Sequence, residues 1–207
     1  DRSLWSVWDN PTVTESAKLT DMPPGPDVDY EGEGEIIRVT GRPENGKRTI
    51  IEDPQTHLIT GATIQKTPIP YQITQYGAVT KQIAISFDDG PDPQWTPKIL
   101  DILQQENVKA TFFEIGAEAQ KNIGLVRRLY REGHEIGNHT CTHPNIAEIS
   151  PTRLRWELNA TELLFKSKLG VQTLYFRPPY SVDQEPDTSD EVRPLEIVEK
   201  LNYVIVG

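Results

Sequence analysis

From residue 82 onward, short apolar runs alternate with amphipathic segments, and this alternation restricts the fold more than any other feature. The intervening segments carry apolar residues at helical spacing, so they predict helices. Repeated strand–helix units imply parallel strands, because each helix returns the chain to the start of the next strand. The sequence therefore predicts an α/β fold, with strands within QIAISF (82–87), KATFFEIG (109–116), HEIGNH (134–139), TLYFRPPY (173–180) and NYVIVG (202–207).

Turn and cap residues mark the ends of the predicted helices. Thr96-Pro97 and Ser150-Pro151 are typical of helix starts, where proline lacks only an amide that would have no partner. Gly133 and Gly170 are typical of helix ends. The acidic segment SVDQEPDTSDEV (181–192) predicts a loop, followed by a short helix that begins at Pro194.

Residues 1–80 have a different character, rich in Pro, Gly, Asp and Thr and without a helical stripe. Three stretches, 32–41, 47–53 and 57–67, are β-rich, and an Asn45-Gly46 turn signal separates the first two. We predict an irregular and β-rich linker module over 1–80, mostly irregular over 1–30, ahead of a domain at 81–207.

Charge and composition exclude some classes of partner. The 207 residues carry a formal net charge of −10, and such a chain repels nucleic acid and anionic membrane surfaces. We therefore expect no nucleic-acid partner and no membrane contact from this segment, whereas uncharged sugars remain compatible. The single cysteine, Cys141, excludes an intramolecular disulfide.

Residues that can perform chemistry follow three of the five predicted strands. Asp88-Asp89 end the first, the pair His139 and His143 follows the third, and Arg177 to Tyr180 end the fourth. The carboxyl ends of parallel strands meet at one rim, so we expect these residues to converge. Each group alone is explained as a solvated turn, a chance pair or a surface ion pair. Their coincidence on one rim favours a functional site.

The two histidines suggest a metal site. They are four residues apart, so both would face one side if the backbone turned helically there. No glutamate follows His139, which excludes the HExxH zinc motif. Adjacent residues of an extended segment point in opposite directions, so one of Asp88 and Asp89 can complete the site while the other faces a substrate. Two histidines and one carboxylate leave room for a water molecule, as in catalytic metal sites.

Other candidates have simpler structural explanations. His134 begins the third strand, at the opposite end from His139, and His57 is typical of a turn. Cys141, two residues from each rim histidine, should point away from them and pack as a small apolar group. Trp95 is open to two interpretations, stacking on a sugar ring or partial burial at a helix start.

Three motifs, in order, resemble those of the NodB-type polysaccharide deacetylases, carbohydrate esterase family 4: SFDDGP (86–91), HTCTH (139–143) and RPPY (177–180). The resemblance covers residues 82–207. It implies a distorted (β/α) barrel and a divalent metal ion, expected to be Zn²⁺. It also implies roles: Asp88 as general base, Asp89, His139 and His143 as metal ligands, Arg177 orienting the base, and Tyr180 offering its backbone N–H to the oxyanion.

The activity implied by the resemblance is metal-dependent removal of the N-acetyl group from N-acetylglucosamine units of a polysaccharide. The glycan would be chitin-, peptidoglycan- or poly-N-acetylglucosamine-like. Two alternatives are a non-catalytic glycan-binding or scaffolding domain that retains the metal site, and an amidohydrolase of small non-sugar amides. We expect an extracellular or cell-envelope location, including tethering through a membrane domain outside this segment.

The chain also departs from the family pattern. The later Asp-Trp motif and the Leu-x-Leu-His motif, whose histidine is the family's expected general acid, do not appear, and Cys141 stands where an aromatic residue is common. Five strands cannot close such a barrel, so we expect it to be incomplete at the C-terminus, with unpaired edges on the first and fifth strands. DYEGEGEIIRV and IPYQITQYG resemble the linker of multi-domain bacterial proteins with a family 18 glycosidase-like region upstream.

Overall fold

The structure, a computed structural model, describes residues 19–180 and 186–207 of the chain. The predicted parallel strands are confirmed: β7 (Ser86–Gly90), β8 (Thr111–Glu114), β9 (Glu135–Asn138), β10 (Tyr175–Phe176) and β11 (Val204–Val206) lie side by side in that order. Adjacent members of the series pair in parallel. Their carboxyl ends therefore form one rim, as the sequence predicts.

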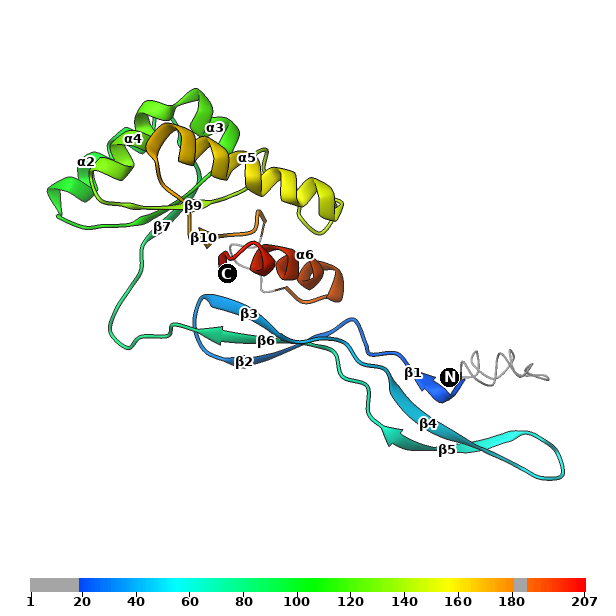
Figure 1. The fold of residues 1–207 in the computed structure, drawn as a ribbon. Coiled ribbons are helices and arrows are strands. Elements are labelled where there is room, and N and C mark those ends of the chain that lie inside the picture. The colour runs from blue at the N-terminus through cyan, green and yellow to red at the C-terminus, as the bar shows by residue number, and fades with distance from the viewer. Residues whose placement is uncertain (1–18, 181–185) are drawn as a thin grey trace.

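The helices that accompany this sheet are α2 (Thr96–Gln105), α3 (Gly116–Lys121), α4 (Ile123–Arg131), α5 (Pro151–Leu169) and α6 (Ser189–Lys200). Figure 1 shows α2 to α5 gathered over β7 and β9, with α6 nearer β3. The predicted ends of α5 are confirmed, because Ser150 Oγ accepts from Arg153 N at its start and Gly170 is left-handed at its end. Among the described residues, no helix is both long and apolar enough to cross a membrane.

Helix α6 begins earlier than the sequence predicts. The chain enters it at Ser189 rather than Pro194, because Thr188 and Glu191 form a reciprocal capping box that satisfies free N–H groups at the helix start. Pro194 lies inside the helix. The predicted acidic loop is therefore wrong at its C-terminal end, while residues 181–185 lie outside the described residues. The short helix α3 was not predicted.

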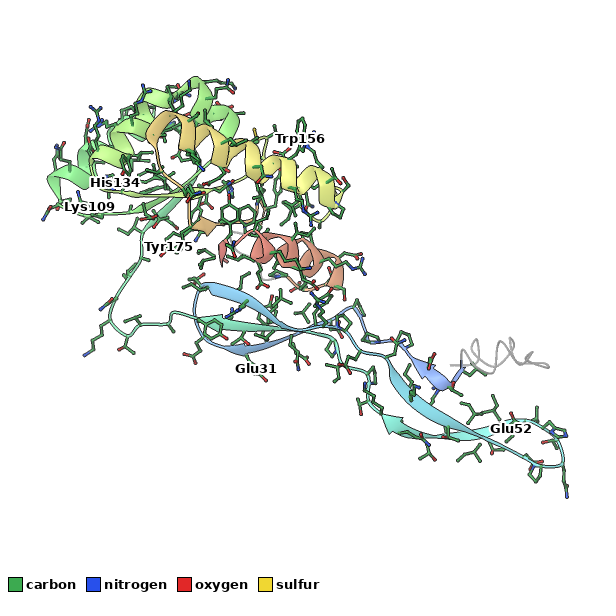
Figure 2. The ribbon with its side chains drawn as sticks, in the orientation of Figure 1. Glu31, Glu52, Lys109, His134, Trp156 and Tyr175 are labelled. Carbon is green, nitrogen blue, oxygen red and sulfur yellow. The ribbon has the colours of Figure 1, made fainter. Side chains whose placement is uncertain are left out.

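The N-terminal region contributes to both sheets of the structure. Its strands β2 (Val28–Gly32), β6 (Tyr71–Tyr76) and β3 (Ile36–Gly41) extend the sheet of β7 to β11, whereas β1 (Asp21–Met22), β4 (Gly46–Glu52) and β5 (Ile59–Lys66) form a second sheet. The β4–β5 hairpin, which carries Glu52, projects away from the parallel strands (Figure 2). The predicted β-rich stretches are confirmed. The expected irregularity of 1–30 is wrong at β1 and β2, and residues 1–18 lie outside the described residues.

Strand β11 is not an edge of the sheet. It pairs antiparallel with β3, in a register that places Ile205 opposite Ile37. Both side chains are buried, so the pairing satisfies the backbone of β11 and extends the core under α6. The predicted unpaired edge is therefore wrong for the fifth strand. Strand β7 does lie at one end of the sheet within the described residues.

A fully buried carboxyl group lies beneath the end of β7. Glu114, the last residue of β8, is paired in register with Gly90, and a Cβ added to Gly90 would come within 2.9 Å of Glu114 Oε1. Neither side-chain oxygen has a hydrogen-bond partner in the described structure. Burial raises the pKa of Glu114 to about 8, because the charged form loses its hydration there.

This buried group predicts a specific pH dependence of stability. Between the ordinary pKa of 4.5 and about 8, the folded chain holds a proton that the unfolded chain has released. The free energy of unfolding should therefore fall as pH rises through that window, by up to about 1.4 kcal/mol per pH unit. Urea unfolding at pH 5, 7 and 9 should show this loss for the native chain and a smaller one for Glu114→Gln. Identical pH profiles for the two proteins would contradict the assignment.

Candidate active site

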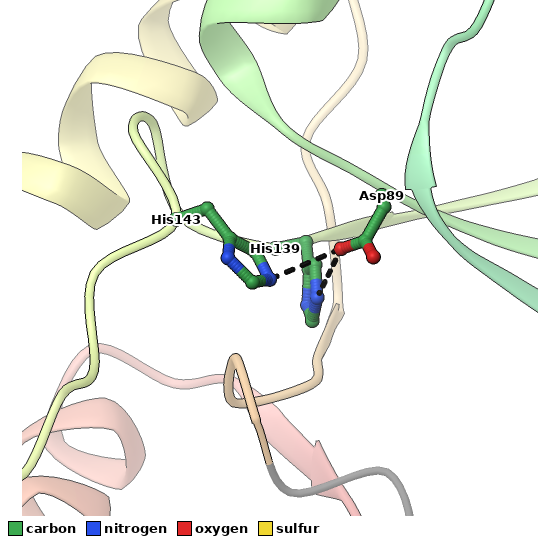
Figure 3. A group of neighbouring side chains, drawn as sticks. All are labelled: Asp89, His139 and His143. Carbon is green, nitrogen blue, oxygen red and sulfur yellow. Dashed lines mark ion pairs between the residues drawn. The ribbon is translucent and has the colours of Figure 1, made fainter.

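The rim brings together the three side chains that the sequence analysis assigned to a metal. Asp89 Oδ1 lies 3.0 Å from His143 Nε2 and 3.3 Å from His139 Nε2 (Figure 3). One ligand atom from each residue lies within 4.8 Å of the others. A tetrahedral ion with contacts of about 2.0–2.1 Å would hold such atoms about 3.4 Å apart. The donor set and its spacing therefore fit one divalent ion.

The backbone reaches this arrangement by a different route from the one predicted. Asp89 has a left-handed φ of 65°, and the β7–β8 register shifts between Phe87 and Gly90. This irregularity, rather than extended alternation, separates Asp89 from Asp88. The segment from His139 to His143 is a loop, so the helical turn considered for the two histidines does not form, and the loop brings them together instead.

His139 is held in one orientation by its second ring nitrogen. The Nδ1 atom lies 2.7 Å from the carbonyl oxygen of Arg177, an arrangement in which Nδ1–H donates and the lone pair of Nε2 faces Asp89. His139 is 1% exposed, and burial lowers the pKa of its imidazole. The neutral ring is the form that binds a metal. The Asp89 side chain is 67% exposed, which leaves the site open to solvent on that side.

Asp88 points to a different partner from Asp89. Its Oδ1 accepts from Arg177 Nη1 at 3.0 Å, and the same nitrogen donates to Ser86 Oγ at 2.8 Å. The guanidinium carbon lies 4.4 Å from the centre of the Phe113 ring. Asp88 Oδ2 is buried and has no hydrogen-bond partner in the described structure. The arrangement therefore aims one carboxylate and leaves an oxygen available to accept a proton.

Tyr180 reaches the rim after β10. Its ring meets that of His143 edge to face at a centroid distance of 4.7 Å, while the residue stays 65% exposed. Like Asp89, Thr140 and His143, it has a left-handed φ. Such conformations cost non-glycine residues about 1–3 kcal/mol each and persist where the surroundings enforce them, often at functional sites.

The other candidates lie where the sequence analysis expected structural residues. His134 is buried at the start of β9, where its Nδ1 accepts from Ala110 N, and His57 lies in the turn of the β4–β5 hairpin. Cys141 is half-buried, and burial raises the pKa of its thiol. Trp95 is 57% exposed just before α2, with Lys98 Nζ 4.4 Å from the centre of its ring. Trp95 therefore lies at a helix start, as one of its two interpretations had it, with more than half of its surface exposed.

Ser86 and Asn138 support the site but were not predicted from the sequence. Ser86, two residues before Asp88, shares the Arg177 guanidinium with it, and period-two spacing on a strand is the signal that would place both on one face. Asn138 is buried beside His139. Its Oδ1 accepts from Thr140 N at 2.9 Å and its Nδ2 donates to Leu158 O at 3.1 Å. A polar residue at the end of a buried strand was the available signal.

Comparison with known proteins identifies relatives of this chain. A peptidoglycan-N-acetylglucosamine deacetylase of Bacillus cereus is 48% identical over 99 residues, which are 48% of this chain and 36% of that protein. A chitooligosaccharide deacetylase of Bradyrhizobium sp. (strain ANU 289) is 39% identical over 110 residues, or 52% of this chain and 50% of that protein. The chain thus spans half or less of the length of these two relatives.

Solved structures agree with the sequence comparison. The crystal structure of the Bc1960 peptidoglycan N-acetylglucosamine deacetylase, in complex with 4-naphthalen-1-yl-N-oxidanyl-benzamide, superposes with a TM-score of 0.53 at 41% identity. The match covers 59% of this chain and 54% of the deacetylase chain. The predicted fold class, the distorted (β/α) barrel type of these deacetylases, is confirmed by this likeness. The family described as "Polysaccharide deacetylase" matches residues 76–205, and the chain therefore belongs to the polysaccharide deacetylase family.

Proposed function

We propose that the chain hydrolyses the N-acetyl group of N-acetylglucosamine units in a polysaccharide. The observation that carries this proposal is the division of the two aspartates, with Asp88 aimed by Arg177 and Asp89 grouped with two histidines. This arrangement offers a base beside a metal site, and amide hydrolysis by a metal-held water can use both. The named relatives act on peptidoglycan and chitooligosaccharide, and both names support a glycan of N-acetylglucosamine as the substrate class.

The metal would be held by Asp89, His139 and His143, and their nitrogen and oxygen donors favour Zn²⁺. A divalent ion bound there would supply Lewis acidity to the acetyl carbonyl and to a water molecule. The solvent-exposed side of Asp89 is the side from which water and substrate would arrive.

The remaining steps belong to residues of the chain. Asp88 would remove a proton from the attacking water through Oδ2, which has no other partner, and Arg177 would keep that carboxylate oriented. The backbone N–H of Tyr180 would stabilise the negative oxygen that develops on the acetyl carbon. The leaving amine must gain a proton. Among the described residues, Asp88 would carry the proton taken from the water, so it is the group that could pass a proton to the amine.

We propose residues 81–207 as the catalytic unit, and the family match, which begins at residue 76, supports a boundary near there. Residues 1–80 would then be a linker module, although its strand β3 pairs with β11 of the catalytic unit within one sheet. A polysaccharide of this class lies outside the cell membrane, so we propose an extracellular or cell-envelope location.

Metal binding tests the ligand assignment. Replacing His139 with alanine removes a buried ligand, so stoichiometric zinc should disappear from the purified chain when it is measured by elemental analysis. His57→Ala is the matched control, because His57 lies in the distant hairpin turn and should leave the metal content unchanged. Full zinc content in His139→Ala would show that the ligand set is wrong.

The two aspartates should respond differently to the same change. Asp88→Asn should keep the metal and lower acetate release from N-acetylglucosamine oligomers by roughly 10²–10⁴-fold, the usual contribution of a general base. Asp89→Asn should lower the metal affinity itself. Equal losses of metal in both variants would refute the division of roles. A metal-loaded native chain that binds the oligomers but releases no acetate would support the non-catalytic glycan-binding alternative.

A further inference from the structure

The loop that carries both histidine ligands needs an anchor. Thr140 and His143 both have left-handed φ values, 66° and 58°, although neither is glycine. Such a loop keeps its shape only where its neighbours hold it. On one side, the first N–H groups of α3, from Gly116 and Ala117, donate to the carbonyl oxygens of Thr140 and Cys141, each at 2.9 Å.

The other side of the loop is held by a single carboxylate from α5. Glu157 Oε2 accepts from the backbone N–H of Cys141 at 3.0 Å and of Thr142 at 2.8 Å. Its Oε1 accepts from Thr142 Oγ1 at 2.8 Å and from Arg153 Nε at 2.7 Å. The residue is 2% exposed, so water cannot readily replace it as the acceptor.

Glu157 is one of the buried residues of α5. Burial by itself would raise the pKa of Glu157, but hydrogen bonds from Thr142 and Arg153 outweigh it and lower the pKa, which keeps the carboxylate charged. Arg153 lies four residues before Glu157 on α5, so their ion pair joins two residues of the same helix and does not itself hold the loop. The bonds to the loop backbone are therefore the main structural consequence of this carboxylate.

We propose that Glu157 is a positioning residue for the metal site: its carboxylate fixes the 139–143 loop so that His139 and His143 both face Asp89. The inference rests on the proposed function, because it concerns the same metal site. Glu157 is not among the proposed metal ligands, and it would act through its bonds to Cys141 and Thr142. Changes to residues that orient metal ligands lower metal affinity by about 10–100-fold, and we expect an effect of this size.

Helix α5 also supplies a matched control. Glu162, five residues further along, accepts from Thr173 N at 3.1 Å and from Thr173 Oγ1 at 2.6 Å. It therefore anchors a loop to the same helix by the same chemistry, but the loop is the one before β10 and carries no metal ligand. A general effect of losing a helix carboxylate should appear in both variants, whereas a positioning effect should appear only at Glu157.

The first test measures metal affinity and geometry in the 207-residue chain. Dissociation constants for Co²⁺ would be obtained by competition with a chromophoric chelator, and the visible absorption of bound Co²⁺ would report its geometry. Glu157→Ala should bind about 10–100-fold more weakly, with an altered spectrum, and Glu162→Ala should match the native chain. Glu157→Gln retains one acceptor oxygen for the backbone N–H groups, so its affinity should be intermediate.

The second test is hydrogen exchange in the metal-free chain, a readout that depends on neither metal nor activity. The amides of Cys141 and Thr142 should exchange faster in both Glu157 variants than in Glu162→Ala. Native affinity and native exchange in the Glu157 variants would overturn the inference. Should Glu157→Ala fail to fold, the same two measurements on Glu157→Gln decide, and native values there would also overturn it. A native chain that binds Co²⁺ but releases no acetate would refute the proposed function and leave this inference standing.

Discussion

Arg177 connects the two halves of the site, and the rest of the arrangement depends on its position. Its carbonyl oxygen orients His139, and its guanidinium orients Asp88. The backbone N–H of Arg177 donates to Asn138 O at the end of β9, so the parallel pairing of β9 and β10 sets this position directly. The proposed ligand His139 and the proposed base Asp88 are thus placed relative to each other by one residue at one strand end.

The site combines strain with dense hydrogen bonding. Left-handed backbone at Asp89, Thr140, His143 and Tyr180 is unfavourable for each residue separately. Buried acceptors and donors from neighbouring elements offset that cost, and Asn138 and Glu157 are the clearest of them. The aimed side chains are therefore held before any substrate arrives, which is the condition under which a polar site stabilises developing charge best.

The N-terminal strands make the last parallel strand, β11, an interior strand of the sheet. By pairing with β11, strand β3 satisfies a backbone that would otherwise be exposed, and Ile37 and Ile73 join the core under α6. The strands that carry the proposed catalytic residues and the N-terminal strands β2, β6 and β3 therefore belong to one hydrogen-bonded sheet. A boundary drawn from composition alone does not reveal this connection.

The sequence alone determined the α/β class, the five parallel strands and the membership of the rim, because hydrophobic periodicity and strand direction are local properties of the chain. It also identified Asp88, Asp89, His139, His143, Arg177 and Tyr180 as the residues that meet there. Only the tertiary structure decided how they meet. The left-handed Asp89, the non-helical histidine loop, the pairing of β3 with β11 and the buried Glu114 all depend on contacts between distant segments. Those contacts override local preference, since a conformation that is unfavourable for one residue is retained when several buried hydrogen bonds require it.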